Sequence, residues 1–457
     1  MLQKVEGVVL KDGVPLSDLI DCERREVGQR VFSDAEIYQL ELKQIWAKTW
    51  IAIGHETEIP NAGDFVTRRI GDDPVIMVRR RDGTVDCHLN VCPHRGTVVC
   101  RPEAGNATAF RCIYHGWMFN LDGSFRGLPF QGEMYPDGMD KSRMGLRSAK
   151  VETFGGIVFA NWDENAAPLS DFLGDFEFYL NMMMNKTESG YEVLGPPQRF
   201  VINANWKTAS EQFASDAAHA NQLHRSLADI SGLDRNNPEH WQMYAPKVST
   251  PSGHSVICFD QRGVYETVAE GKELSWVEKL SIMPPPGMSA DQVPALAKQF
   301  SESELEFLAD TPPANGGMFP NVGLWNSTGF LPDKSMAGFC SLRTYVPLGM
   351  DKFEFTMWMM VSKDASEELR DHVRRTGSFM QGASGFVEGD DAEVWPGTTT
   401  GAVGYIGRQN TMKYWPMSGH NPPENWPGAG NVHTGLAMDD TQWAWWQHYF
   451  DCLHGKV

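Results

Sequence analysis

Two short segments of the chain hold metal-binding side chains at a fixed spacing. Each supplies one cysteine and one histidine and then continues into glycine, as Cys92-Pro93-His94-Arg95-Gly96 and Cys112-Ile113-Tyr114-His115-Gly116-Trp117. Zinc fingers also use two cysteines and two histidines, but they usually pair Cys with Cys and His with His. With one of each per loop, both thiolates can bind one iron of a 2Fe–2S cluster while both imidazoles bind the other. The pattern favours such a Rieske cluster over structural zinc, with the ligands Cys92, His94, Cys112 and His115.

This mixed ligand set has an electrical consequence. Two neutral imidazoles in place of two thiolates remove negative charge from one iron, which raises the reduction potential above that of an all-cysteine plant-type cluster. Each imidazole also keeps a second ring nitrogen that can donate a hydrogen bond outward. We expect the cluster to accept single electrons and to pass them on through one of its histidine ligands.

A second group of candidate ligands lies in residues 205–224. Asp216 and His219 stand at i and i+3, so on a helix they would share one face. His219 and His224 are five apart, which is about 140° round a regular helix, so both reach one metal only if the helix bends or ends between them. Two histidines on a helix are more often structural than metal-binding, and the segment alone does not establish a site.

A carboxylate late in the chain completes a possible ligand set. The segment Gly385-Phe386-Val387-Glu388-Gly389-Asp390-Asp391 places two consecutive aspartates after a glycine-containing turn. Acidic pairs are usually solvated or cap a helix, but two histidines and one carboxylate make the facial triad of non-haem Fe(II) oxygenases, which leaves positions open for O₂. An electron-carrying cluster beside an O₂-binding iron is a coherent combination, because O₂ activation at Fe(II) needs electrons delivered in step.

The elements that must position these residues change in character along the chain. Residues 32–48 have apolar positions at helical spacing, whereas 50–162 holds short β-rich segments separated by turns. Further helices are expected at 169–185, from 206 onward and at 366–381, and alternating antiparallel strands at 338–344 and 352–361. We therefore predict an α+β protein: an all-β Rieske 2Fe–2S domain over 49–168, and a catalytic mononuclear iron domain over 1–48 and 169–457 whose antiparallel sheet is covered by helices.

Composition argues against several classes of function. The 457 residues carry 40 basic and 59 acidic side chains, a net charge of −19, which argues against nucleic acid or an anionic membrane as partner. The N-terminus lacks a signal-peptide pattern, and no run approaches the roughly eighteen apolar residues of a membrane span. The six other cysteines are scattered, so we expect reduced thiols and a cytoplasmic protein. No segment makes a G-x-G-x-x-G turn after a strand, so electrons must come from a separate reductase.

In its motifs the sequence resembles a known family, the catalytic α subunits of the Rieske non-haem iron aromatic-ring-hydroxylating dioxygenases, and looks closest to the naphthalene and biphenyl types. The resemblance implies a terminal oxygenase with a helix-grip catalytic domain, one 2Fe–2S cluster and one mononuclear Fe(II). It runs through nearly the whole chain and rests on Leu40-Glu41-Leu42, Gly63-Asp64-Phe65, the two Cys–His segments, Asn205-Trp206-Lys207, the Asp216-x-x-His219-x-x-x-x-His224 spacing, Phe319-Pro320-Asn321 and Gly385-Phe386…Asp390-Asp391.

The resemblance also implies roles for single residues. His219, His224 and the second aspartate, Asp391, would bind the mononuclear iron. Asp216 would carry electrons from a cluster histidine of one subunit, matching His115, to His219 of its neighbour, because a carboxylate between two imidazole N–H groups orients both. The family arranges its α subunits head-to-tail in a trimer, often with a small β subunit. An α3 or α3β3 oligomer is therefore expected, with a ferredoxin and a reductase as electron donors.

Five positions are substrate-pocket candidates by their place in the motifs: Phe213, Ala220, Asn321, Gln381 and Val387. Phe213 fits ordinary core packing as well as substrate contact. Gln381 is polar where the family often has an apolar residue, which indicates either a hydrogen bond to a polar ring substituent or a place at the surface. Two departures concern the iron and the pocket: Gln212 replaces an Asn that is frequent in the family, and Val387 replaces the Trp of the dioxygenase that attacks naphthalene.

The expected activity is O₂-dependent cis-dihydroxylation of an aromatic ring, with electrons from NAD(P)H delivered by the ferredoxin and reductase. One alternative is a Rieske monooxygenase or demethylase, which inserts one oxygen with the same metals; the acidic ligand pattern and the chain length favour dioxygenation. A second alternative is an electron carrier without oxygenase activity. A carrier would need only the all-β domain and would leave the rest of the chain unexplained.

Overall fold

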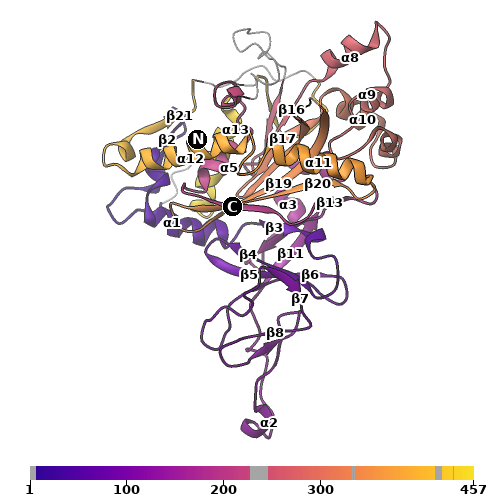
Figure 1. The fold of residues 1–457 in the computed structure, drawn as a ribbon. Helices are drawn as coiled ribbons and strands as arrows, with labels where there is room; N and C mark the ends of the chain where they lie inside the picture. Colours follow the sequence, from indigo (N-terminus) through magenta and orange to yellow (C-terminus); the bar gives the residue numbers. More distant parts are fainter. Residues whose placement is uncertain are drawn as a thin grey trace. The chain divides into compact units, whose positions relative to one another are not determined.

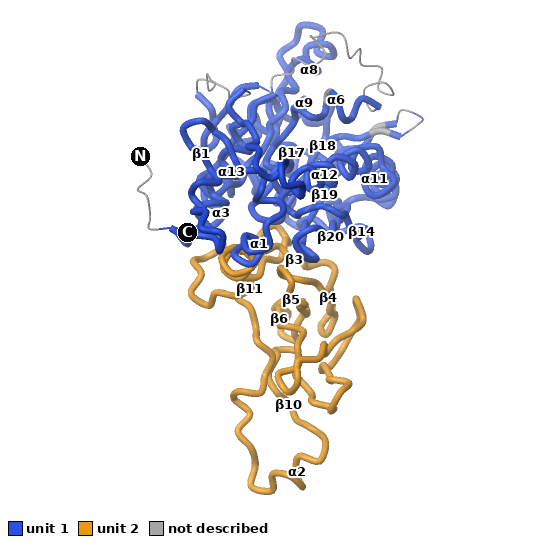
Figure 2. The backbone as a smooth tube through the Cα atoms, turned by 90° about the vertical axis from the view of Figure 1, so that its left-hand side faces the viewer, with its two compact units in different colours: residues 1–41, 170–457 blue, residues 42–169 orange. Residues whose placement is uncertain are grey.

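The computed structural model describes residues 7–226, 245–331, 333, 335–416, 425–435 and 437–456, and Figure 1 shows the course of the chain. The chain divides into two compact units, drawn in separate colours in Figure 2: residues 42–169, and residues 1–41 together with 170–457. The larger unit is therefore built from both ends of the sequence, and the smaller unit is inserted between them.

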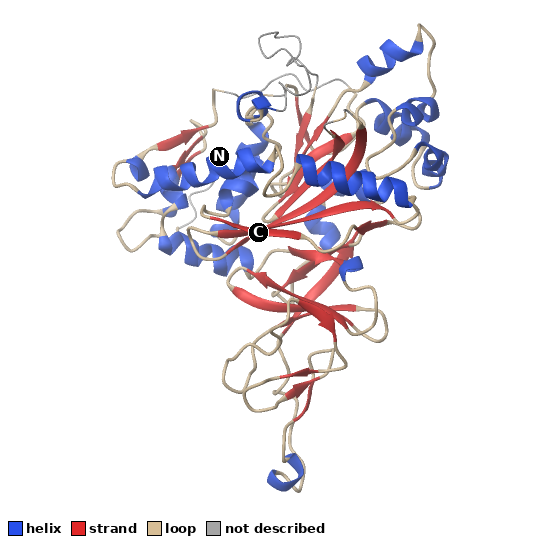
Figure 3. Cartoon of the chain, viewed as in Figure 1, coloured by secondary structure: helices blue, strands red, loops and turns tan. Residues whose placement is uncertain are grey.

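The regular structure of the smaller unit is mainly β-strand, and long loops connect the strands, as Figure 3 shows. Its strands have continuous apolar stretches; β5 is buried from Val75 to Val78. In the described part of the chain they form a seven-stranded antiparallel sheet in the order β3-β12-β11-β6-β5-β4-β7. The bounds are β3 Ile51–His55, β4 Asp64–Ile70, β5 Asp73–Arg79, β6 Val85–Leu89, β7 Ala104–Asn106, β11 Ser148–Phe154 and β12 Ile157–Asn161.

A second, small sheet in this unit carries one of the Cys–His loops. It pairs β8 (Phe110–Arg111), β9 (Met118–Phe119) and β10 (Phe125–Gly127). The loop of Cys112 and His115 joins β8 to β9, whereas the loop of Cys92 and His94 follows β6. Both cysteines belong to one apolar core with the aromatic rings of these strands, so the sheets hold the two loops in place. Short helices complete the unit: η3 (Leu42–Trp46), η4 (Glu56–Glu58) and α2 (Gln131–Met134).

The larger unit is organised on one long antiparallel sheet. Its order is β13-β20-β19-β18-β17-β16-β15-β22, and β14 also pairs with β20. The strands β18, β19 and β20 are the longest, and β19 pairs with β20 from Cys340↔Met360 to Pro347↔Phe353. The bounds are β13 Tyr191–Val193, β14 Gln198–Ile202, β15 Lys247–Ser249, β16 Ser255–Cys258, β17 Pro313–Met318, β18 Val322–Phe330, β19 Met336–Pro347, β20 Phe353–Ser362 and β22 Asn431–His433. A separate small sheet consists of β1 (Ile20–Asp21), β2 (Glu26–Gly28) and β21 (Thr411–Lys413).

Helices cover this sheet. The amphipathic α11 (Glu367–Met380) packs across β18, β19 and β20. Helix α12 (Glu388–Val403) packs on α5 (Lys207–Gln212) and β14, and α13 (Asp440–Leu453) packs on α5 and β15. The others are α1 (Ala35–Glu41), α3 (Leu169–Leu173), α4 (Phe176–Met184), α6 (Ala220–Leu223), α8 (Arg262–Ala269), α9 (Trp276–Ile282), α10 (Glu302–Asp310) and the 3-10 turns η1 (Leu16–Leu19), η2 (Gln29–Phe32), η6 (Ala290–Lys298) and η7 (Gly407–Gln409). The predicted α+β fold, an all-β domain with a helix-covered antiparallel sheet, is confirmed.

A buried ion pair joins three helices of the larger unit. Lys207 Nζ of α5 donates to Glu41 Oε1 of α1 at 2.6 Å, and both side chains are almost fully buried. The same carboxylate accepts from Trp206 Nε1 at 2.8 Å and from the Tyr449 hydroxyl of α13 at 2.5 Å. Four hydrogen-bonding groups thus satisfy one another away from water, which fixes the position of α5.

Helices lie in all four segments predicted to be helical, but not every segment is one helix. The segment 169–185 contains two, α3 and α4, which are separated at Gly174 and Asp175. Helix α11 begins where expected, because Ser366 Oγ accepts from the Leu369 N–H at 3.2 Å, and it ends at Gln381. The helical stretch expected from Trp206 onward is instead broken after Gln212. Within the residues described, no helix is long and apolar enough to span a membrane. No disulfide joins any of the eight cysteines, all of which lie among the described residues.

Candidate metal centres

The two Cys–His loops have the same backbone geometry. The Gly96 N–H donates to the Cys92 carbonyl at 2.9 Å, and the Gly116 N–H donates to the Cys112 carbonyl at 3.0 Å. Both glycines adopt positive φ, +76° and +71°, a conformation that a side chain would strain. Glycine at these positions therefore lets each loop turn back on its own cysteine.

The four side chains of these loops converge. The rings of His94 and His115 lie with their centroids 4.5 Å apart, and His94 stacks on Trp117 at 4.8 Å. The cysteines are 1% exposed, and burial together with the neighbouring Cys112 thiol raises the pKa of Cys92. The Nδ1 atoms of both histidines are enclosed without a hydrogen-bond partner among the described residues. Two unpartnered imidazole nitrogens beside two thiols fit the donor set of a 2Fe–2S cluster with mixed ligands.

The second candidate centre begins where helix α5 ends. Residues 213–219 form turns, and α6 is a single turn with His219 before it and His224 after it. The predicted placement of Asp216 and His219 on one helical face is therefore wrong. Asp216 Oδ1 instead accepts from the Ala218 N–H at 2.9 Å, a local bond that competes with the helix, and Ser215 has a φ of +70°. Helix α6 ends at Leu223, so the helix ends before His224, as the spacing of the two histidines requires.

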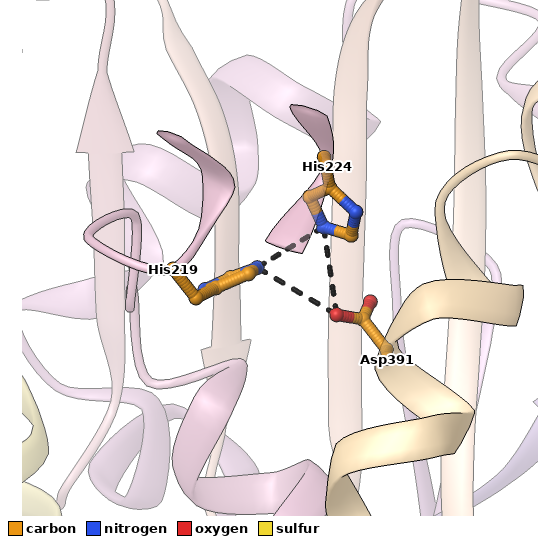
Figure 4. Close-up of side chains that lie close together, drawn as sticks. All are labelled: His219, His224 and Asp391. Atoms are coloured by element: carbon orange, nitrogen blue, oxygen red, sulfur yellow. Dashed lines mark hydrogen bonds and ion pairs between the residues drawn. The ribbon is translucent and has the colours of Figure 1, made fainter. Parts of the chain in front are cut away.

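The two histidines and an aspartate from a distant part of the sequence meet at one point (Figure 4). The Nε2 atoms of His219 and His224 are 3.2 Å apart, and Asp391 Oδ1 lies 3.7 Å from the first and 3.5 Å from the second. One donor atom from each residue lies within 4.8 Å of the other two. Like-facing imidazole nitrogens next to a carboxylate oxygen are the donor set of a facial triad.

Each histidine turns its other nitrogen towards a carboxylate. His219 Nδ1 lies 3.1 Å from Asp216 Oδ2, and His224 Nδ1 lies 3.3 Å from Asp390 Oδ2. Burial opposes charge on His219, but Asp216 outweighs it and raises the pKa of that imidazole. Burial and the neighbouring His219 lower the pKa of His224. Carboxylate partners of this kind fix the ring orientation of metal-binding histidines.

Gln212 holds the aspartate of this group. Its Nε2 donates to Asp391 Oδ1 at 2.7 Å, and its Oε1 accepts from Trp395 Nε1 at 2.7 Å. Asp391 and Trp395 are both on α12, one turn apart, so α12 presents the carboxylate and also anchors the amide that orients it. Burial raises the pKa of Asp391 to about 6, against the opposing effects of His219 and Gln212. A divalent cation bound here would compensate the negative charge of the ionised Asp391 carboxylate.

A cavity of about 550 Å³ opens beside Asp216 and His219, and Glu211, Gln212 and Trp395 also line it. Glu211 Oε1 accepts from the Tyr414 hydroxyl at 2.9 Å. Burial, reinforced by Asp216, raises the pKa of Glu211 to about 8. This side of the centre therefore presents two carboxyl groups to the cavity whose pKa values are shifted in opposite directions, that of Glu211 upward and that of Asp216 downward.

The five pocket candidates lie in different surroundings. Val387 immediately precedes α12 and accepts from the Asp391 N–H at 3.2 Å. Phe213 follows Gln212, and its ring lies 5.4 Å from that of Tyr345. Gln381 is fully buried, so burial excludes the predicted alternative of a surface position. Ala220 begins α6 beside His219, and Asn321 is buried in the turn between β17 and β18.

Several residues at this centre received no role from the sequence. In the sequence, Asp390 is only the first member of an acidic pair, and Arg343 belongs to no recognisable motif. Glu388 and Trp395 stand three residues before and four residues after Asp391, which is the helical spacing of one face. That spacing is the signal that could have identified them, given that 388–403 forms a helix.

Comparisons with known proteins agree with this geometry. Residues 49–150 match the model of the Rieske [2Fe-2S] domain, and residues 191–410 match that of the ring hydroxylating alpha subunit, catalytic domain. The biphenyl dioxygenase subunit alpha of Metapseudomonas furukawaii is 33% identical over 410 residues, which is 86% of this chain and 83% of that protein. The N,N-dimethyl phenylurea N-demethylase subunit alpha of Sphingobium sp. (strain YBL2) is 29% identical over 98% of this chain and 97% of its own.

Among solved structures, naphthalene 1,2-dioxygenase from Rhodococcus sp., bound to indole, superposes with a TM-score of 0.83 at 31% identity, covering 94% of this chain and 95% of that one. The chain therefore belongs to the α subunits of the aromatic-ring-hydroxylating Rieske dioxygenases, as its motifs predicted. It is an oxidoreductase whose cofactors are a Rieske 2Fe–2S cluster and a mononuclear non-haem iron.

Proposed function

We propose that this α subunit cis-dihydroxylates an aromatic ring at an iron held by His219, His224 and Asp391. The observation that carries the proposal is the approach of one donor atom from each of these residues to within 4.8 Å of the others. We further propose that the 2Fe–2S cluster is held by the thiolates and Nδ1 atoms of Cys92, His94, Cys112 and His115, because those nitrogens are enclosed and unpartnered.

The bound iron supplies O₂ activation, and the chain supplies orientation and exclusion of water. Asp216 and Asp390 hold the two imidazoles so that both Nε2 atoms face the centre. Gln212 holds the carboxylate of Asp391 by a hydrogen bond of 2.7 Å. Val387 immediately precedes α12, and its apolar side chain is 5% exposed, so it keeps water away from the start of this helix. These residues keep the donor set fixed while a ring and O₂ enter.

We also propose that Asp216 connects this centre to another copy of the chain. Asp216 lies next to His219 and lines a cavity, so the carboxylate can receive a second imidazole. By the family's arrangement that imidazole is the residue of a neighbouring subunit equivalent to His115. A ferredoxin and a reductase would supply the electrons, and an α3 or α3β3 oligomer would bring the two centres together.

The decisive experiment is a single turnover of the chemically reduced oligomer under ¹⁸O₂ with a panel of aromatic compounds, read by mass spectrometry. Two labels in one cis-diol are expected. Two matched variants test the ligand assignment. His219→Ala removes a proposed iron ligand and should abolish diol formation, whereas His372→Ala removes a histidine of α11 outside this centre and should not. Labelled diol from His219→Ala, with its iron content unchanged, would refute the assignment of the ligand.

A second candidate function is oxidative N-demethylation. It is favoured by one observation: the phenylurea N-demethylase subunit aligns from end to end with this chain, over 98% of one and 97% of the other. In the same experiment with an N,N-dimethyl phenylurea, demethylation would release formaldehyde and leave no diol. Formaldehyde without any diol across the panel would replace the first candidate by the second.

A further inference from the structure

A set of polar side chains lies together on one face of the long sheet. Trp325 of β18 is paired directly with Ser341 of β19, and Arg343 follows Ser341 by two residues, so all three point to the same face. Gln381, at the end of α11, contacts Ser341 from above this face. We call Trp325, Ser341, Arg343 and Gln381 the polar wall.

Two contacts of Arg343 connect the polar wall to residues next to the candidate iron ligands. The Arg343 guanidinium lies 5.1 Å from the centre of the Phe213 ring, and Phe213 is next in sequence to Gln212, which binds Asp391. Arg343 Nε also donates to Glu388 Oε1 at 2.7 Å. Glu388 precedes Asp391 by one turn of α12, so the same helix contacts the polar wall and supplies the proposed iron ligand.

A chain of hydrogen bonds fixes the direction of the Gln381 amide. Arg343 Nη1 donates to Ser341 Oγ at 2.8 Å, and Ser341 Oγ lies 2.9 Å from Gln381 Oε1. The serine hydroxyl accepts the hydrogen bond from arginine and donates its own hydrogen to Gln381 Oε1. Ser341 therefore contacts the oxygen of the Gln381 amide and not its nitrogen, Nε2.

Two N–H donors of the polar wall are enclosed and unsatisfied. Gln381 is 0% exposed, and neither its Nε2 nor Trp325 Nε1 has a hydrogen-bond partner among the described residues. Buried donors in native proteins almost always have a partner, and leaving one unpaired is costly. A bound molecule with a hydrogen-bond acceptor would satisfy them.

The charge of the polar wall is already balanced. Arg343 and Glu388 are 0% and 1% exposed, and they form an ion pair with each other. An anionic substituent entering here would add an uncompensated buried charge, which costs more than a neutral acceptor. A bare hydrocarbon would leave both donors unpaired.

We propose that the substrate is an aromatic ring carrying a neutral oxygen acceptor, such as the carbonyl of a ketone, amide or urea, and that Gln381 Nε2 donates to this oxygen. The inference rests on the proposed function, in which the ring binds beside the iron. It names a narrower class of substrate than the aromatic hydrocarbons, and it makes Gln381 a specificity-determining residue.

Three compounds of similar size test this class of substrate: acetophenone, its hydrocarbon isostere α-methylstyrene, and benzoate. Their binding to the oxidised holoenzyme oligomer is measured by titration calorimetry without turnover. We expect acetophenone to bind about tenfold more tightly than α-methylstyrene, the size of one well-placed hydrogen bond, and benzoate to bind most weakly. Equal binding of the first two, or tightest binding of benzoate, would overturn the proposal.

Substitutions of Gln381 assign the preference to its amide. Gln381→Leu is expected to abolish the preference for acetophenone and to leave α-methylstyrene binding unchanged or stronger. Gln381→Met, which keeps length and flexibility, serves if the leucine variant does not fold. Gln409→Leu is the same chemical change at an exposed position and should keep the preference. A preference retained in folded Gln381→Met would overturn the assignment.

The binding test of the polar wall and the ¹⁸O₂ test of the proposed function can fail independently of each other. A clear preference for acetophenone, with no labelled product from any ring, would refute the iron chemistry and leave the polar wall supported. Labelled product from α-methylstyrene, with equal binding of the two isosteres, would refute the polar wall alone.

Discussion

At the scale of single residues, each histidine of the triad has two carboxylate neighbours, one for each ring nitrogen. Asp391 faces both Nε2 atoms, whereas Asp216 and Asp390 face the Nδ1 atoms. The acidic pair Asp390-Asp391 is therefore divided between two tasks. One member is placed to bind the metal, and the other is placed to orient a ring that binds it.

Gln212 provides the first prediction. Gln212→Leu removes the donor to Asp391 and leaves the buried carboxylate free to rotate, so we expect iron affinity at the mononuclear site to fall by about 10- to 100-fold. Iron per chain is measured against acid-labile sulfide, which reports the cluster and should not change. The control is Gln222→Leu, since Gln222 is exposed and lines the same cavity. Equal iron loss in both variants would contradict the role of the Gln212 amide.

Glu211 provides a prediction about pH. It faces Asp216 and the Tyr414 hydroxyl, with Trp446 and Asp439 near, and burial raises its pKa from 4.5 to about 8. Between these values the folded protein keeps a proton that the unfolded chain has lost, so this group makes stability fall as pH rises.

We expect Glu211→Gln to melt with a smaller loss of Tm between pH 5 and about pH 9 than the parent protein, because an amide does not titrate in this range. Differential scanning calorimetry across this range measures the effect. Glu393→Gln, an exposed acid on α12, is the control and should follow the parent curve. If the Glu211→Gln curve runs parallel to the parent curve, Glu211 is ionised in the folded state.

The sequence motifs were sufficient to name the residues that converge, but not the geometry that brings them together. The spacing of His219 and His224 required a helix break, and the break is there. Nothing in the sequence showed that Asp216 would lie outside a helix. Its side chain accepts a hydrogen bond from the Ala218 N–H, and helix propensity does not predict whether an aspartate makes this local bond or continues the helix. Arg343 was missed because its partner Glu388 is 45 positions away.

At the scale of elements, α5 is positioned by the buried pair Glu41–Lys207. Glu41→Ala would leave a buried ammonium without a partner, so we expect a loss of about 3–5 kcal/mol in the free energy of unfolding. The double variant Glu41→Met with Lys207→Met removes both charges and should lose much less. Urea unfolding followed by tryptophan fluorescence measures both. A double variant no more stable than Glu41→Ala would show that the packing of α1, and not the ion pair, matters here.

The two halves of this ion pair also show what sequence motifs can and cannot say. Leu40-Glu41-Leu42 and Asn205-Trp206-Lys207 are two of the motifs that carry the family resemblance, and the sequence alone gives no physical reason for either. The structure supplies the reason, since the carboxylate of one motif contacts the ammonium and the indole of the other. Contacts between segments more than a hundred positions apart carry no local signal, whereas helix α11 is one continuous segment and was predicted over 366–381.

At the scale of the whole molecule, the two candidate centres lie in different compact units. His115→Ala would remove a cluster ligand in one unit, and His219→Ala would remove an iron ligand in the other. If electrons pass between subunits, an oligomer that mixes these two inactive chains contains some interfaces with an intact donor and an intact acceptor. In a head-to-tail trimer that contains both variants, one of the three interfaces is of this kind, so we expect about a third of the parent activity.

Co-expression of the two variants with different affinity tags, followed by two-step purification, provides the mixed oligomer. Each variant alone should be inactive in substrate turnover. Mixing the separately purified homo-oligomers without reassembly is the control and should also be inactive. A mixed oligomer with no activity, although both metals are present, would place the electron path within one chain.

The triad also has a consequence for the folding of the larger unit. His224 and Asp391 belong to segments far apart in the sequence, joined here by polar contacts of 3.5 Å. A metal bound by both would act as a cross-link, and closing so long a loop removes much of the freedom of the unfolded chain. Bound iron would then stabilise the larger unit as well as take part in the chemistry. Chelation should lower the melting temperature of this unit, and added Fe(II) should restore it, with a stabilisation that rises with the logarithm of the Fe(II) concentration.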